Sequence, residues 1–116
     1  MNAPVTSFRV AMAQLDFLVG DIQGNTDQII AAAAEARDRL RADLIVFPEL
    51  TITGYPPEDL LLRPGFVRQV EPALQRLCDG IRGIAAVVGC PLPTPEGLRN
   101  AAVVLDDGAI RATYYK

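Results

Sequence analysis

The 116-residue sequence contains no histidine, which excludes histidine-based acid–base catalysis and most zinc sites within the chain. Its only two cysteines, Cys78 and Cys90, are too few for a disulfide framework and lack Cys-x-x-Cys spacing. No apolar run approaches the roughly 18 residues of a membrane span, and the N-terminus lacks the features of a secretory signal. These absences predict a cytoplasmic protein that has no membrane partner.

Positive charge is also scarce. Eleven basic residues stand against 14 acidic ones, the net charge is −3, and no basic stripe runs along the sequence, so a nucleic-acid partner is not expected. Half of the residues are hydrophobic and 22% are charged, which is typical of a folded globular chain. The length fits one domain or part of a larger one.

Short apolar runs alternate with helical patterns along the chain. Buried strands are expected at residues 8–15, 44–47 and 84–89. Asn25, with Gln28 three residues later, has the spacing of a capping box, so the first helix is expected to begin there. A second helix is expected over residues 66–77, with a kink or a restart at Pro72.

The C-terminal third contains a hairpin signal. Residues 90–99 are rich in proline and are expected to form a loop. Beyond them, Asp-Asp-Gly at 106–108 separates two apolar runs, 100–105 and 109–115, and this pattern predicts a β-hairpin. The whole order, β-α-β-α-β and a hairpin, predicts an α/β fold with a mixed, mostly parallel sheet.

The last residue is of interest because of strand alternation. Ile110, Ala112 and Tyr114 are expected to share one face of the final strand. Lys116 has the same parity and would follow them inward, where a lysine needs a carboxylate partner or a catalytic role.

Glu49 is the carboxylate best placed for chemistry. It follows a buried strand, and in open α/β sheets functional groups gather at the carboxyl ends of strands. Desolvation beside Phe47 and Pro48 would suit a general base. On position alone, an ordinary loop or helix-capping glutamate is an equally good interpretation.

Other candidates have stronger structural explanations. Glu58 and Asp59 follow two prolines, where acids favour the first turn of a helix. Tyr55 lies in a Gly-Tyr-Pro turn and could line a pocket near the glutamate or simply pack. Cys90 could complete a Cys-Glu-Lys set, but free cysteines such as it and Cys78 are usually small core residues.

Five segments, "RVAMAQLDFLVGDIQGN", "ADLIVFPELTITGYPPEDLLLRPGF", "VVGCP", "NAAVVLDDGAI" and "YYK", together resemble the nitrilase superfamily of carbon–nitrogen hydrolases. The stretch "YPPEDLLLRP" resembles one branch, the N-terminal glutaminase domains of glutamine-dependent NAD synthetases. The resemblance implies that residues 1–116 form the first half of an α-β-β-α sandwich, a partial glutaminase domain.

The resemblance also implies a Glu-Lys-Cys triad and a substrate, glutamine. Glu49 matches the family's base and Lys116 its lysine, while Tyr55 is expected near the glutamine. The nucleophilic cysteine belongs to a segment that this chain does not contain, so Cys90 is not expected to serve and the chain alone is expected to be inactive. No cofactor is expected in the chain; ATP and magnesium are expected in a separate synthetase domain, and a homo-oligomer is expected for the full-length protein.

Two other interpretations remain open from the sequence. The chain could be part of a stand-alone amidase or carbamoylase of the same superfamily, although "YPPEDLLLRP" counts against this. It could also be a non-catalytic α/β interaction domain that has kept the fold without the nucleophile.

Overall fold

The computed structural model describes residues 7–116, so residues 1–6 of the expected domain lie outside the described residues. The strands are β1 (Val10–Met12), β2 (Leu44–Val46), β3 (Ala85–Thr94), β4 (Gly97–Asp106) and β5 (Ala109–Tyr115). The helices are α1 (Ile22–Asp38), the 3₁₀ helix η1 (Glu58–Leu62), α2 (Pro64–Val67) and α3 (Val70–Gly80). None of the helices in this part of the chain is long and apolar enough to cross a membrane.

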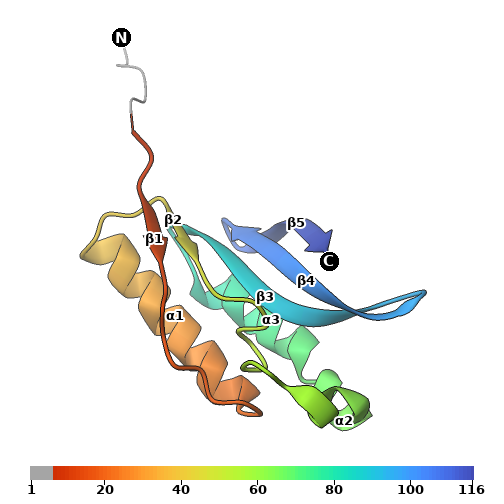
Figure 1. Cartoon of the computed structure of the whole chain (residues 1–116). Coiled ribbons are helices and arrows are strands. Elements are labelled where there is room, and N and C mark those ends of the chain that lie inside the picture. Colours follow the sequence, from red (N-terminus) through yellow and green to blue (C-terminus); the bar gives the residue numbers. More distant parts are fainter. Residues whose placement is uncertain (1–6) are drawn as a thin grey trace.

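All five strands join one mixed sheet in the order β1-β2-β3-β4-β5, which confirms the predicted fold class (Figure 1). β1, β2 and β3 pair in parallel, whereas β3, β4 and β5 pair in antiparallel fashion. Two of the four strand pairings are parallel, so the sheet is mixed as predicted but is not mostly parallel. The crossovers between the parallel strands contain α1 and α3, because parallel neighbours need a long connection that usually includes a helix.

The helices α1 and α3 pack side by side against one face of the sheet (Figure 1). The core between them and the sheet includes Ile29, Leu77, Ala86, Val88 and Val103, all fully buried. The opposite face, which we call the open face, carries Met12, Val46, Val87, Ala102 and Tyr114. Within residues 7–116 no helix covers this face, and Met12 is 79% exposed and Tyr114 66%.

The prediction of a loop at residues 90–99 is wrong. β3 continues to Thr94, β4 begins at Gly97, and the two strands pair as far as Thr94 and Gly97. The prolines are compatible with a strand because of the direction in which their backbone groups point. The carbonyls of Val87 and Gly89 accept hydrogen bonds from the β2 side, so alternate residues of β3 turn their backbone groups that way. Pro91 and Pro93 share this alternation, and their missing N–H groups remove no bond to β4.

A β-bulge in β5 changes the side-chain alternation that the sequence predicts for this strand. The Asp107-Gly108 turn, with positive φ at both residues, forms the predicted hairpin. Leu105 pairs with Ile110 but Val104 pairs with Ala112, which leaves Arg111 as an extra residue. Ile110 therefore lies on the helix side, whereas Ala112 and Tyr114 remain on the open face.

The first helix begins earlier than expected. α1 starts at Ile22 and is capped by Asp21, whose side chain accepts a hydrogen bond from the Gly24 N–H at 2.9 Å. The predicted cap, Asn25, is instead buried inside the helix, and its amide joins two loops: it bonds both backbone groups of Leu18 and the carbonyl of Ile52. Asn25 therefore connects distant segments of the chain and does not cap the helix.

The second helical region agrees with its prediction. The chain leaves α2 at Val67 and restarts at Val70, which places Pro72 in the first turn of α3, where its missing N–H costs no helical bond. Glu58 and Asp59 occupy the first turn of η1, as expected for acids at a helix start.

Replacing Asn25 with alanine should lower the free energy of unfolding by about 2–3 kcal/mol, because it removes three hydrogen bonds and leaves the buried carbonyl of Ile52 and the partly buried backbone groups of Leu18 without this partner. Urea unfolding followed by circular dichroism measures this. Gln23→Ala, on the exposed side of the same helix, is the matched control and should change stability by less than about 0.5 kcal/mol. Equal effects of the two substitutions would contradict the role given to Asn25.

Candidate active site

Glu49 is positioned by a close approach of two backbone segments. After β2, the Phe47 N–H donates to the Val87 carbonyl at 2.9 Å, and the Ile52 N–H donates to the Gly89 carbonyl at 3.2 Å. The segment between these bonds arches across β3 at Gly89. A Cβ atom at Gly89 would lie 2.5 Å from the Leu50 nitrogen, so only glycine allows this approach.

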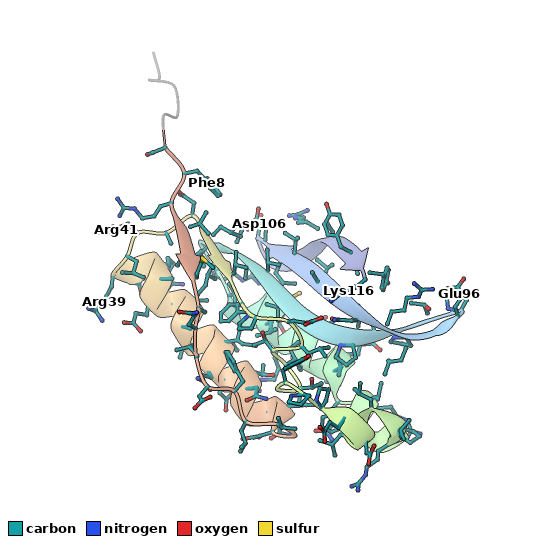
Figure 2. All side chains as sticks on the ribbon, viewed as in Figure 1. Phe8, Arg39, Arg41, Glu96, Asp106 and Lys116 are labelled. Atoms are coloured by element: carbon teal, nitrogen blue, oxygen red, sulfur yellow. The ribbon has the colours of Figure 1, made fainter. Side chains whose placement is uncertain are left out.

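The arch brings Glu49 to the end of β5. Lys116 Nζ lies 3.3 Å from Glu49 Oε1, and Figure 2 shows Lys116 where β5 ends. The Asn100 side-chain amide donates to the same oxygen. Together these contacts give a carboxylate held by a cation and an amide on the open face of the sheet.

The three side chains share a cavity of about 290 Å³. Its walls come from the end of β2 and from β3, β4 and β5, and include Phe47, Pro48, Val87, Ala102, Tyr114 and Tyr115. The cavity therefore combines aromatic and aliphatic walls with a few converging polar groups, which is typical of small-molecule sites. The Glu49 side chain is 43% exposed, so a reacting group can reach it.

A larger groove of about 610 Å³ lies elsewhere, between α1 and the α2–α3 region. Its main charged groups, Asp27 and Arg76, pair with one another in an exposed ion pair. Such pairs at the surface are common and carry little energy. The smaller cavity, with an acid, a cation and an amide converging, is the better functional candidate.

Neither cysteine belongs to this cavity. Cys90 alternates with Gly89 in β3 and points into the core between sheet and helices, where it is fully buried. Burial raises the pKa of the Cys90 thiol to about 12. Burial also raises the pKa of Cys78, with the neighbouring Asp79 contributing. Both thiols stay protonated at neutral pH and are placed as core residues.

The predicted site residues are only partly brought together. The structure joins Glu49 and Lys116, but the lysine is not drawn into a core: its side chain is 80% exposed on the open face. Tyr55 is 63% exposed and does not line the Glu49 cavity in the described part of the chain, so its contact with substrate stays a prediction. No group of three possible metal-binding side chains occurs in residues 7–116.

Sequence reasoning missed Asn100. Asn100 is a polar residue that opens an apolar run, and it shares the alternation of Ala102 and Val104 on the open face. This pattern was visible in the sequence. Asn100 could be recognised as a site residue only once the strand order was known, because β4 lies between β3 and β5, beside both Glu49 and Lys116.

A mixed sheet with a glutamate after β2 and a lysine after β5 defines the class of this protein. The chain belongs to the carbon–nitrogen hydrolase family, whose sequence pattern matches residues 9–116.

Within that family, the chain is 54% identical over 118 aligned residues to the glutamine-dependent NAD(+) synthetase of Xanthomonas campestris pv. campestris, covering 100% of this chain and 21% of the relative. It is also similar to the solved structure of glutamine-dependent NAD+ synthetase from Acinetobacter baumannii, with a TM-score of 0.88, 39% identity, 94% of this chain covered and 20% of that one. The chain thus spans about one fifth of the length of these synthetases.

A third similar protein is an amidase from Nesterenkonia sp. AN1. The solved structure of a mutant of it, with the acetamide moiety of fluoroacetamide covalently added at its active site cysteine, gives a TM-score of 0.83 and 34% identity. The match covers 94% of this chain and 42% of the amidase.

Gly89→Ala should lower the free energy of unfolding by about 1–3 kcal/mol, because the new methyl group would collide with the backbone at Leu50 and force the arch that carries Glu49 to move. The measurement is urea unfolding. Gly65→Ala is the control: a Cβ there meets no atom within 4 Å, so its effect should stay within about 0.5 kcal/mol. A Gly89→Ala variant as stable as the control would show that the approach is not tight.

Proposed function

We propose that this chain supplies the general base and the oxyanion-stabilising lysine of a glutamine-hydrolysing site, and that the ammonia released is used to convert deamido-NAD to NAD. The observation that carries the proposal is the pairing of Glu49 and Lys116 at 3.3 Å in a cavity on the open face. The identity of 54% to an NAD(+) synthetase that depends on glutamine supports the choice of substrate.

The proposed reaction is acyl transfer through a cysteine. The thiol gives its proton to Glu49 as its sulfur attacks the side-chain amide carbon of glutamine, and the tetrahedral oxyanion is stabilised by the Lys116 ammonium. Glu49 returns the proton to the leaving nitrogen, so ammonia departs and a thioester remains. Water then attacks the thioester, again losing a proton to Glu49, and glutamate and the free thiol are released.

The nucleophile in this proposal comes from polypeptide outside residues 1–116, because both cysteines of the chain are buried in the core. The covalent adduct at the active site cysteine of the similar amidase supports a cysteine as the attacking group. Tyr55 is proposed to contact the substrate. ATP and magnesium would bind in a synthetase domain outside this chain, and a cytoplasmic homo-oligomer is proposed for the full-length protein.

A second candidate function is hydrolysis of small aliphatic amides by a stand-alone enzyme. The likeness to the Nesterenkonia amidase, of which the chain covers 42%, favours it. The higher identity to the synthetase, 54% against 34%, favours glutamine. Comparing the rates of the full-length protein on glutamine and on butyramide discriminates between the two.

In the full-length protein, Glu49→Gln should lower the rate of glutamine-dependent NAD formation by about 100- to 10,000-fold, because the base is lost. The rate with added ammonium salt should not change, since free ammonia bypasses the site. Glu58→Gln, at the start of η1, is the control and should retain both rates. A Glu49→Gln variant that still uses glutamine at the normal rate would overturn the proposal.

The 116-residue chain by itself should release no ammonia from glutamine above the rate of a buffer blank, because it provides the base and the lysine but no accessible thiol. A coupled glutamate dehydrogenase assay measures this. Turnover by the isolated chain, abolished by Glu49→Gln, would show that the proposed nucleophile is wrongly assigned.

A further inference from the structure

We propose that Asn100 is the positioning residue of this site: it holds the Glu49 carboxylate so that one oxygen is anchored and the other is left for proton transfer. The inference rests on the proposed function. Its basis is a set of contacts at one residue of β4, which lies between the two partners.

The first observation is that Asn100 touches both members of the pair. Its side-chain amide donates to Glu49 Oε1, and its backbone carbonyl accepts a hydrogen bond from the Lys116 N–H at 2.9 Å. The same residue therefore fixes the carboxylate and the backbone of the lysine. No other residue in the described part of the chain bonds to both.

The second observation concerns the two carboxylate oxygens. Oε1 accepts from Asn100 and from Lys116 Nζ, whereas Oε2 accepts no hydrogen bond from any residue in 7–116. Two donors on one oxygen restrict rotation of the carboxylate and leave the other oxygen unoccupied. A general base needs this combination, because its accepting oxygen must be oriented and available at once.

Asn100 is better suited than Lys116 to fix the carboxylate. The lysine side chain is long, flexible and 80% exposed, and exposed ion pairs are held weakly. Asn100 has a short side chain, is half-buried, and starts from a strand paired on both sides, with Pro91 of β3 opposite it. The lysine ammonium is then free to follow the charge that develops on the substrate.

The test uses the full-length protein with two variants that keep the branched shape and the number of heavy atoms of the asparagine side chain. Asn100→Leu removes the donor, and Asn100→Asp replaces it with a second negative charge. Both should lower kcat with glutamine about 100-fold, the usual effect of a misplaced catalytic group, with little change in KM. The Asn100→Asp variant should also shift the acid limb of the pH profile of kcat/KM upward, because a neighbouring carboxylate disfavours ionisation of Glu49.

The rate with ammonium salt is the internal check that the NAD-forming reaction itself is intact, and it should stay at the wild-type level in both variants. Arg99→Leu is the matched control: it is the adjacent residue of β4, exposed and alternating to the other face, and should keep the normal kcat. Normal kcat in both Asn100 variants, while Glu49→Gln remains inactive, would overturn the positioning role and leave the proposed function intact. A change in KM for glutamine with kcat unchanged would also overturn it. So would an ammonium-dependent rate that falls as much as the glutamine-dependent rate. A wild-type protein inactive on glutamine would overturn both proposals.

Discussion

The close approach of the segment after β2 to Gly89 of β3 is the constraint on which the site depends. Parallel pairing carries Phe47 alongside Val87, and the chain then crosses β3 instead of continuing as a strand. The absence of a side chain at Gly89 permits the crossing, and the crossing points Glu49 toward the ends of β4 and β5. The Glu49 carboxylate is thus placed by backbone contact and not by a long flexible loop, which is the kind of placement that the proposed role as a base requires.

The two faces of the sheet have different roles. The core between the sheet and helices α1 and α3 is close-packed and contains both cysteines, Cys90 from β3 and Cys78 from α3, so neither thiol is accessible. The open face has apolar strands and the Glu49–Lys116 pair, and residues such as Met12 are highly exposed on it. Glu49 and Lys116 are therefore reached from this face. An apolar sheet surface of this kind is normally a contact surface, so the polar pair lies where other groups are expected to gather.

The parts of the fold that local patterns determine were predictable from the sequence. β2, the hairpin turn at Asp107-Gly108 and the acids at the start of η1 follow from apolar runs, turn residues and helix charge. Other features depend on tertiary partners and were not predictable. Asn25 looks like a cap until its partners in two distant loops are known, and Arg111 gives no sign of a bulge without its pairing strand. The approach of Lys116 to a carboxylate could be anticipated, but Asn100 could not be placed without the strand order.

The prolines of β3 have one more consequence. β2 ends at Val46, so the edge of β3 that faces β2 has no strand partner beyond the site. The backbone of Pro91 and Pro93 faces this edge, and proline has no N–H to donate there. A neighbouring strand could not complete a regular ladder there, which protects this border against edge-to-edge aggregation. The same border cannot be sealed by added backbone. Pro91 and Pro93 therefore limit how far backbone pairing can extend along the strand that forms the floor of the site.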